Sequence, residues 1–438
     1  MNAYIEKLLM NPLIMVYLCQ LMRNVKRAEK NPEYWKVIQR KQIKKFVKYI
    51  YTIPFYRERF DRVHLTPKDI VNTEDFLKLP VLTKDEYREW VSAELKENPD
   101  KYKHWIHKST SGSTGIPTPV YMTSSDGARE TASYIRGILS YGYSLLKDKI
   151  VAVETCASPV ESILQKLGLA RRIQLIATRP SDYLVEEYNK VKPDFIYGVK
   201  TAIQLMAEYS IKLGVKLHTP KCVCIGSEQL DENARTIIEK AFGTEHVVDL
   251  YGTVESGFLA ASKIGSPSEY VIWHDIICVN ILDGNDNPCT SGIGKFTVTT
   301  ITRKGFPLVN YDQNDLVEVY SQNDILYLKK IYGRRNDRIL NEDGSAYSWI
   351  HFSKLFKGIY SLAHFRIIQN DYNQLQMLAV KSPFTDKTEM EIEQILTEKA
   401  NDIFSEHPKK IEFIWKESLP QDANGKLRTV INNIKAKN

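Results

Sequence analysis

Short apolar runs alternate with amphipathic stretches through the middle of the chain. Five such runs are typical of buried strands, at residues 150–153, 173–177, 195–197, 222–225 and 247–251. Between them, residues 201–213 and 231–242 carry apolar side chains at helical spacing. An alternation of strands and helices is typical of an α/β domain with a largely parallel sheet. We therefore predict an α/β core.

The pattern changes after about residue 270. Apolar and polar residues then alternate, with Gly, Asn and Asp turns, over residues 294–302, 316–320 and 325–331. This alternation predicts an antiparallel sheet or a small barrel. The last hundred residues read β-β-α-β, with elements at 365–369, 374–380, 389–404 and 410–415. That order predicts a small α+β domain.

Two helices are predicted before residue 52. Asn11-Pro12 is a good helix start, with Asn as the N-cap and Pro at the first helical position. The second helix is expected over residues 33–51, and its basic residues recur at a spacing of four: Lys36, Arg40, Lys44 and Lys48. Two interpretations stay open for this basic face. It is either a solvated surface on a helix packed by its other side, or a surface for anionic lipid.

The charge of the 438-residue chain is concentrated in the same region. The net formal charge is +7, with +8 in residues 1–50 and −1 in the rest. A nucleic-acid coat needs a broad basic face, so we expect no nucleic-acid partner. No run is long and apolar enough to span a bilayer. We expect a cytoplasmic protein, with peripheral contact between residues 1–50 and an anionic membrane as an open alternative.

Six cysteines give no disulfide framework, which fits a reducing compartment. The one closely spaced pair, Cys222 and Cys224, flanks a single residue in an apolar run. We interpret both as core residues on one face of a strand rather than as metal ligands.

The segment 109–117, with the sequence STSGSTGIP, is the most informative loop. Its glycines permit sharp turns that bring main-chain N–H groups close to a ligand, and its hydroxyls add donors. It lacks the Lys of the Gly-x4-Gly-Lys-Ser/Thr loop. The pattern is typical of a phosphate cradle, with these candidate residues: Thr110, Ser111, Gly112, Ser113, Thr114 and Gly115.

Further segments place glycines or charged residues directly beside predicted strands. They are residues 224–228, 249–255, 311–315, 333–339 and 425–428. Each alone is more often a turn than a site. In this order, together with the phosphate loop, they resemble the adenylate-forming superfamily of acyl-CoA synthetases, luciferases and peptide-synthetase adenylation domains.

Two upstream segments narrow the resemblance. Residues 52–60 (TIPFYRERF) and 79–84 (LPVLTK) look like the phenylacetate-CoA ligase branch. Residues 365–369 (FRIIQ) look like relatives assigned to capsular polysaccharide biosynthesis. The resemblance implies a large domain over residues 1–335, with mostly parallel sheets, helices and a small antiparallel barrel or sheet. It also implies a small mobile α+β domain over 336–438.

The resemblance implies an enzyme that activates a carboxylic acid as an acyl-adenylate at the expense of ATP and then transfers the acyl group to CoA. One alternative is an adenylating ligase whose acceptor is an amino sugar or a carrier, without CoA. The other is a non-catalytic nucleotide-binding scaffold. ATP and Mg2+ are the implied cofactors, with CoA among the acceptors, and a homodimer stays open.

Roles follow for the residues that match the family motifs. The implied catalytic residues are Lys426, Glu255 and Thr114, with Glu255 as the Mg2+ ligand and Lys426 beside the α-phosphate. The implied nucleotide contacts are the loop residues 110–115, Lys426 and the following: Gly226, Ser227, Glu228, Tyr251, Gly252, Thr253, Asp315 and Arg334. The candidate substrate residues are Tyr141, Tyr197 and Gly198.

The sequence departs from the family pattern at a few positions. Ile116 replaces a Lys and Val254 replaces a Thr or Ser that would face phosphate. Asn310 and Asn314 stand where Arg and Gly are usual, and Asn336 replaces an Asp. Losing one phosphate hydrogen bond costs about 1–3 kcal/mol. We therefore expect weakened but working adenylation.

Overall fold

The computed structural model describes residues 3–110, 117–155, 165, 167–335, 337–348, 351, 353–356, 359–421 and 426–434, without the side chains of 3–11 and 266–268. The chain divides into two compact units, each built from separate stretches of sequence. Unit 1 contains Met1–Lys147, Pro159–Arg171 and Val248–Ile331. Unit 2 contains Asp148–Ser158, Arg172–Val247 and Tyr332–Asn438. The predicted domain boundary at residue 335 stays a prediction.

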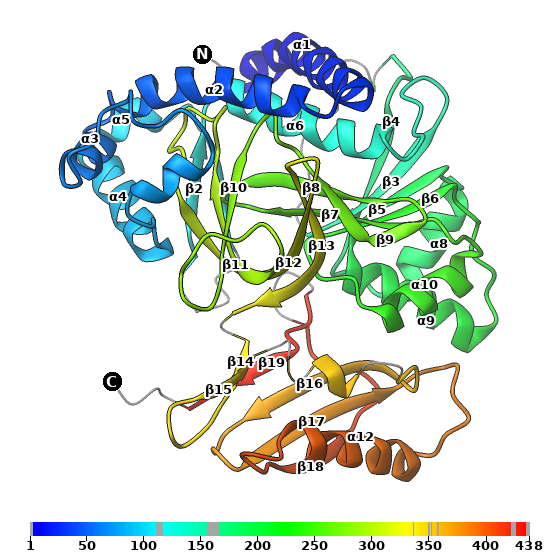
Figure 1. Cartoon of the computed structure of the whole chain (residues 1–438). Coiled ribbons are helices and arrows are strands. Elements are labelled where there is room, and N and C mark those ends of the chain that lie inside the picture. The colour runs from blue at the N-terminus through cyan, green and yellow to red at the C-terminus, as the bar shows by residue number, and fades with distance from the viewer. Residues whose placement is uncertain are drawn as a thin grey trace. The chain divides into compact units, whose positions relative to one another are not determined.

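The described helices of unit 1 are α1 (Ala3–Lys30), α2 (Tyr34–Ile50), α3 (Pro54–Asp61), η1 (Glu74–Lys78), α4 (Lys84–Glu97), α5 (Pro99–Tyr102) and α6 (Ser124–Leu139) (Figure 1). The predicted helix start at Asn11-Pro12 is wrong, because α1 begins at Ala3 and continues through Pro12. An internal proline costs a helix about 3 kcal/mol. Packing of α1 against α6, with Leu18 and Leu21 buried, offsets that cost.

Helix α2 confirms the expected two-sided pattern. One face is buried, at Trp35, Ile43, Phe46, Val47 and Ile50. Most of its basic side chains are exposed, at Arg40, Lys41, Lys44, Lys45 and Lys48. The basic face is therefore a surface feature, and its attraction for lipid stays a prediction.

The strands that follow in unit 1 form an antiparallel sheet. They are β7 (Val247–Thr253), β8 (Gly257–Lys263), β9 (Ser266–Ile272), β10 (Cys278–Leu282), β11 (Gly292–Thr299), β12 (Tyr311–Gln322) and β13 (Ile325–Arg334). Their order is β10-β11-β12-β13-β9-β8-β7. The alternating pattern after residue 270 predicted this antiparallel sheet, which is confirmed. A separate hairpin joins β1 (Ile106–Ser109) to β2 (Pro119–Met122).

Unit 2 contains the predicted parallel strands. They are β3 (Lys149–Glu154), β4 (Arg171–Ile176), β5 (Phe195–Val199) and β6 (Cys222–Gly226), in the order β6-β5-β3-β4. The pairings of β5 with β3 and with β6 are parallel. The connecting helices are α8 (Ser181–Val191), α9 (Lys200–Leu213) and α10 (Glu232–Phe242). The sheet and helices enclose an apolar core, and the predicted α/β class is confirmed.

The C-terminal part of unit 2 has its own core. Its elements are β14 (Arg338–Leu340), β15 (Ala346–Ser348), η2 (Ser353–Leu355), β16 (Leu362–Gln369), β17 (Gln374–Lys381), α12 (Glu389–Ile403), β18 (Lys410–Trp415) and β19 (Val430–Asn432). The sheet order is β18-β17-β16-β19. The predicted β-β-α-β pattern is confirmed, and β19 adds an unpredicted strand parallel to β16.

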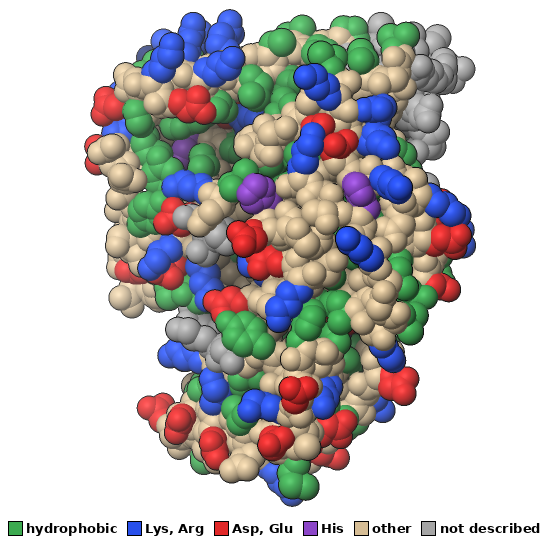
Figure 2. Space-filling model, turned by 90° about the vertical axis from the view of Figure 1, so that its right-hand side faces the viewer, with side chains coloured by type: hydrophobic (Ala, Val, Ile, Leu, Met, Phe, Trp, Pro, Cys, Tyr) green, Lys and Arg blue, Asp and Glu red, His purple; other side chains and the backbone are tan. Residues whose placement is uncertain are grey.

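Two expectations from the sequence concern the cysteine pair and membrane-spanning helices, and both can be compared with the described residues. Cys222 and Cys224 are buried on one strand face, with their Sγ atoms 3.7 Å apart, as predicted. Among the residues that the structure describes, no helix is long and apolar enough to cross a membrane. In the face shown in Figure 2, acidic and basic side chains are interspersed, in keeping with the balanced charge of residues 51–438.

Candidate active site

Two motif residues that are distant in sequence touch each other in unit 1. The hydroxyl of Tyr251, in β7, donates to Oδ2 of Asp315, in β12, at 2.5 Å. Asp315 is buried. An ionised carboxylate accepts hydrogen bonds from hydroxyl donors. The structure therefore brings together two of the residues that the sequence predicts as nucleotide contacts, and that role stays a prediction.

The backbone conformation near Asp315 explains why two asparagines stand where the family pattern has other residues. Asn310 and Asn314 adopt left-handed backbone conformations, with φ of 48° and 60°. Asn tolerates this region better than most residues other than Gly. The Nδ2 atom of Asn310 also donates to the carbonyl of Leu79 at 2.9 Å. Asn314 therefore keeps a backbone that glycine would favour, and Asn310 ties β12 to the chain before it.

The turn after β7 places Glu255. A Cβ on Gly252 would lie 2.5 Å from the carbonyl oxygen of Gly257, so only glycine fits this approach of β7 and β8. The hydroxyl of Thr253 is 2.7 Å from that of Ser256 and donates to Gln313 at 3.2 Å. Glu255 follows, with 4% of its surface exposed.

A lysine that motif reasoning left without a role pairs with Glu255. The Nζ atom of Lys84 lies 2.9 Å from Oε1 of Glu255, and their side chains are 26% and 6% exposed. Arg303 donates to the main-chain carbonyl of Glu255. The available signal was the segment 79–84, which marked the family resemblance but suggested no contact. Sequence cannot reveal a partner that lies 171 residues away.

The segments that marked the family branch build the support for Lys84. The guanidinium of Arg59 donates to the carbonyls of Pro80 and Val81, at 2.7 and 3.0 Å. Leu82 then forms a parallel bridge to Tyr311, at the start of β12. Thr83 caps α4, so that Lys84 is its first residue. These contacts place Lys84 between Glu255 and strand β12, which carries Asp315.

A single buried carboxylate fits one mode of magnesium binding. Mg2+ is commonly held by one or two carboxylates together with substrate phosphates, because it keeps most of its hydration shell. Oε1 of Glu255 faces Lys84, and Oε2 carries no protein hydrogen bond among the described contacts. In the part of the chain that the structure describes, no three metal-binding side chains cluster. The donor set fits an ion shared with phosphates.

The structure describes Thr110 and Thr118, which form the base of the predicted phosphate loop. The N–H of Thr110 donates to the carbonyl of Thr118 at 3.1 Å, and its Oγ1 accepts from the N–H of Thr118 at 2.9 Å. This pair closes a loop between β1 and β2. Ser111, Gly112, Ser113, Thr114, Gly115 and Ile116 lie outside the described residues, and their roles stay predictions.

Unit 2 brings Lys426 to the turn after β6. The Nζ atom of Lys426 donates to the carbonyl of Ser227 at 3.2 Å, across 199 residues of sequence. Ser227 has a left-handed φ of 69°, which turns the chain sharply between Gly226 and Glu228. A Cβ on Gly226 would lie 2.9 Å from the Tyr197 hydroxyl. The predicted catalytic lysine and the predicted nucleotide turn are therefore in contact.

The same region also holds a buried lysine, Lys200. The Nζ atom of Lys200, at the start of α9, lies 3.4 Å from Oδ2 of Asp231. Burial lowers the pKa of Lys200, but the carboxylates of Asp231 and Glu228 outweigh it and raise the pKa above its usual value. Lys200 is thus a paired cation at physiological pH.

Comparisons with known proteins agree with this arrangement. A family model for the CapK C-terminal domain matches residues 339–433. Phenylacetate-coenzyme A ligase from Escherichia coli (strain K12) is 23% identical over 370 residues, covering 78% of this chain and 81% of the relative. The protein of that name from Thermus thermophilus is 24% identical over 307 residues, covering 65% of each.

Solved structures extend the comparison to the fold. A 2-hydroxyisobutyryl-CoA ligase in the postadenylation state, in complex with R3-HIB-AMP, aligns with a TM-score of 0.73 at 19% identity, covering 90% of this chain and 89% of that one. The chain has the fold of adenylate-forming ligases. The anthranilate CoA ligase AuaEII with anthranoyl-AMP aligns with a TM-score of 0.54 at 17% identity, covering 74% and 66%. The fold class expected from the motifs is confirmed.

Within this adenylate-forming fold, the candidate substrate residues have packing roles. The Tyr141 hydroxyl donates to the carbonyls of Ser262 and Asp249, at 2.9 and 3.3 Å, in unit 1. In unit 2, Tyr197 is buried, and a Cβ on Gly198 would lie 2.3 Å from the Val153 carbonyl oxygen. Contact of these residues with a substrate stays a prediction.

The last carried-over residue, Arg334, ends β13, and its carbonyl accepts from the N–H of Asp337 at 3.1 Å. Asn336, at the expected hinge, lies outside the described residues. Nucleotide binding by Arg334 and turning of the C-terminal domain stay predictions.

Proposed function

We propose that this protein is an ATP-dependent ligase that converts a carboxylic acid to an acyl-adenylate, releases pyrophosphate and transfers the acyl group to CoA. Relatives from two bacteria are named phenylacetate-coenzyme A ligase. The compared structures of similar fold hold acyl-AMP intermediates. The observation that carries the proposal is the contact between Lys426 and the carbonyl of Ser227.

The chemistry explains why these residue types are used. A carboxylate is a poor electrophile because oxide is a poor leaving group. Attack of its oxygen on the α-phosphorus of ATP breaks the bond to pyrophosphate and leaves a mixed anhydride, whose AMP departs readily. Negative charge builds on the transferring phosphoryl group, and a compact lysine cation such as Lys426 stabilises it. We assign Asp315 to the ribose hydroxyls.

Magnesium, when bound at Glu255, would supply charge neutralisation at the phosphates. The loop residues 110–115 would supply main-chain N–H and hydroxyl donors at the same phosphates. The turn at Gly226–Glu228, with Tyr251-Gly252, is assigned to the adenine.

Carboxylate-dependent exchange of labelled pyrophosphate into ATP tests the proposal. A panel of aromatic, hydroxy and aliphatic acids should include at least one that supports exchange by the wild-type protein. Lys426→Ala is expected to lower the exchange rate by about 100-fold or more, as loss of a transition-state donor does. Lys410→Ala, at an exposed position of β18, is the matched control. Absence of exchange with every acid would instead favour a nucleotide-binding scaffold.

A second acceptor class is favoured by one observation. Residues 339–433 match the CapK C-terminal domain, and residues 365–369 resemble relatives assigned to capsular polysaccharide biosynthesis. An amino sugar or a carrier is therefore the alternative to CoA. Mass spectrometry of reactions with an acid that supports exchange separates them. A CoA thioester supports the first acceptor, whereas an amide formed only with an amino sugar supports the second.

We further propose that residues 1–50 give a cytoplasmic protein loose contact with anionic membranes. Helix α1 exposes apolar side chains at Leu13, Met15 and Val16, and α2 exposes its lysines. Deleting α1 would uncover α6, so substitution is the better test. Lys44→Glu/Lys45→Glu/Lys48→Glu should abolish sedimentation with vesicles that contain anionic phosphatidylglycerol.

Two controls belong to this membrane test. Neutral phosphatidylcholine vesicles should sediment little protein, and Lys212→Glu/Lys216→Glu, at exposed positions elsewhere, should change nothing. Equal sedimentation of the wild-type and triple-variant proteins with anionic vesicles would contradict membrane contact. The homodimer stays a prediction, which light scattering would check.

A further inference from the structure

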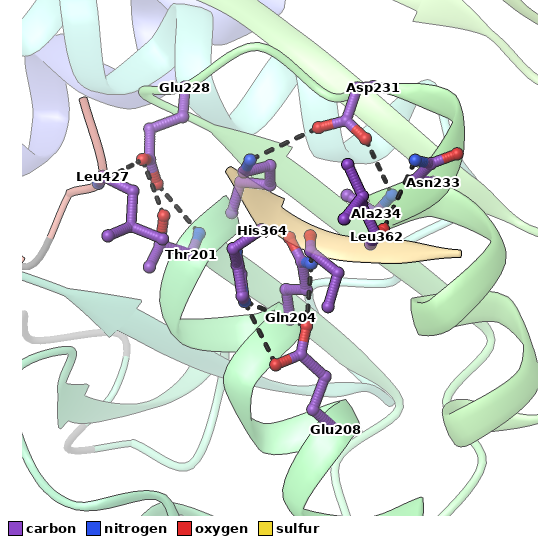
Figure 3. A network of polar contacts seen from close by, with 12 residues as sticks. Thr201, Gln204, Glu208, Glu228, Asp231, Asn233, Ala234, Leu362, His364 and Leu427 are labelled. Atoms are coloured by element: carbon purple, nitrogen blue, oxygen red, sulfur yellow. Dashed lines mark hydrogen bonds and ion pairs between the residues drawn. The ribbon is translucent and has the colours of Figure 1, made fainter. Parts of the chain in front are cut away.

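One side of helix α9 carries three polar residues at helical spacing, Thr201, Gln204 and Glu208 (Figure 3). Each is hydrogen-bonded, and two of them contact the C-terminal part of unit 2 directly. Gln204 Nε2 donates to the carbonyl of Ala363 at 2.9 Å, and Glu208 lies 2.9 Å from His364 Nε2. Helix α9 is therefore a platform against which the segment that begins β16 is held.

Thr201, the first of these three polar residues, is hydrogen-bonded to the carboxylate of Glu228. Thr201 donates its N–H to Oε2 of Glu228 and its hydroxyl to Oε1, both at 2.8 Å. Thr201 is completely buried, so these two bonds fix the carboxylate at the start of the helix. Oε1 of Glu228 also accepts the main-chain N–H of Leu427 at 3.2 Å. The carboxylate thus joins α9 to the residue after Lys426.

Two successive residues of the turn contact two successive residues near the C-terminus. Ser227 accepts from the Lys426 side chain, and Glu228 accepts from the Leu427 main chain, each at 3.2 Å. The lysine ammonium can rotate and exchange partners, whereas the Leu427 contact fixes the backbone beside it. That backbone contact limits where the flexible lysine stem can reach.

The carboxylate of Glu228 already accepts three donors from Thr201 and Leu427. Since a carboxylate has about four lone-pair positions, little of it is left for a nucleobase. The side chain of Glu228 is turned toward Thr201 and Leu427 (Figure 3).

We propose that Glu228 is a positioning residue for Lys426, holding the Leu427 N–H so that the lysine stays at the turn after β6. The catalytic meaning of this contact rests on the proposed function of Lys426, but the contact itself does not. Glu228→Ala should release residues 426–427 without changing the anchoring at Gln204. Glu228→Gln, whose amide oxygen still accepts, should release them only in part.

Two readouts test the positioning without knowledge of the substrate acid. The first is hydrogen exchange at the Leu427 amide, and the second is acetylation of Lys426 by N-hydroxysuccinimide acetate, both followed by mass spectrometry. Glu228→Ala should raise the first about tenfold and the second several-fold. Gln204→Ala, which removes a neighbouring contact of the same helix, should leave both near wild-type values.

Substitutions at Leu427, the donor in this contact, provide an independent test if Glu228→Ala misfolds. Leu427→Pro removes the donor N–H and should raise acetylation of Lys426 as Glu228→Ala does, whereas Leu427→Ala keeps the N–H and should not. In the Leu427→Pro background, Glu228→Ala should add nothing further. Additive effects of the two substitutions would overturn the proposal.

Activity separates the positioning role from a nucleotide-binding one. With an acid that supports pyrophosphate exchange, Glu228→Ala should lower kcat at least tenfold and leave the KM for ATP within twofold. A raised KM for ATP with unchanged acetylation of Lys426 would overturn the proposal and assign Glu228 to the nucleotide. If no acid supports exchange, the ligase proposal fails, while hydrogen exchange and acetylation still decide the positioning.

Discussion

A buried carboxylate is stable only with partners, and Glu255 has one in Lys84. Their contact at 2.9 Å is shielded on the glutamate side and open to water on the lysine side. Removing one member of a buried pair leaves the other charge without compensation. The pair therefore contributes to the stability of the folded chain.

Lys84→Met should lower the free energy of unfolding by about 2–4 kcal/mol, somewhat below the value for a fully buried pair because water screens the lysine. Urea denaturation at pH 7 measures the change. Lys108→Met, which breaks a more exposed pair with Glu130, should cost less than about 1 kcal/mol. Equal losses in the two variants would contradict the importance of burial.

A second carboxylate makes stability depend on pH. The hydroxyl of Tyr102 donates to Glu94 at 2.5 Å, and this bond, aided by Lys101, lowers the pKa of Glu94. A lowered pKa stabilises the folded state above the unfolded value of 4.5, and that contribution disappears as pH falls through the folded pKa. Burial raises the pKa of Tyr102 to about 12, so its hydroxyl stays protonated near neutrality.

Tyr102→Phe should therefore cost about 1–2 kcal/mol at pH 7, as loss of a hydrogen bond to a charged group does. The difference from wild type should shrink steadily below pH 4.5. Urea denaturation at a series of pH values from 3 to 8 measures it. A difference that stays constant over this range would show that the hydroxyl does not act through the charge of Glu94.

At the scale of elements, strands β3 and β5 leave no room for a side chain at Gly198. A side chain there would meet the Val153 carbonyl oxygen at 2.3 Å, well inside van der Waals contact. Because both strands are central and buried, neither can shift without disturbing the core on which α9 packs. The glycine is thus explained by packing alone.

Gly198→Ala should destabilise the protein by about 1–3 kcal/mol or prevent folding, the usual effect of overpacking a rigid core. Thermal unfolding followed by circular dichroism is the measurement. Gly284→Ala is the control, because a Cβ at that position meets no atom within 4 Å. An unchanged melting temperature for Gly198→Ala would mean that the two strands can separate locally.

Elements with a strong local pattern were predictable from the sequence. Residues 195–197 and 222–225 are short apolar runs between helical stretches, and they correspond to β5 and β6. Strand β19 was not predictable, because its three residues have no alternation of their own and pair only with β16. The start of α1 was mistaken because packing on α6 outweighs the local preference of Asn11-Pro12.

The motif residues of the candidate site were predictable from the sequence, but the contacts between them were not. Tyr251 and Asp315 were both named from sequence, but their hydrogen bond joins β7 to β12, two strands that are not neighbours in the sheet. Lys84 carried no signal of its own, since only the tertiary fold brings it to Glu255. The contact of Glu228 with Leu427 depends likewise on two segments that are 199 residues apart.

At the scale of the whole molecule, unit 2 is completed by the end of the chain. Ala363, Val380 and Leu419 pack into the same apolar core as the helices α9 and α10. A chain that ends near the expected boundary at residue 335 would leave this surface uncovered. The C-terminal part thus contributes to stability as well as carrying Lys426.

The chain shortened to residues 1–335 should therefore melt at a lower temperature than the full chain and bind more of the dye ANS, which reports exposed apolar surface. Differential scanning fluorimetry and ANS fluorescence provide the measurements. The triple variant Lys212→Glu/Lys216→Glu/Lys410→Glu of the full chain controls for altered charge. Identical dye binding by the two lengths would contradict the shared core.

The occupied carboxylate of Glu228 has a consequence for nucleobase selectivity. Adenine offers a donor at its exocyclic amine, and guanine offers two neighbouring donors at N1 and at its C2 amine, so a free carboxylate would accept from either base. Since Thr201 and Leu427 engage this carboxylate, we propose that the Glu228 side chain contributes little to the choice between ATP and GTP.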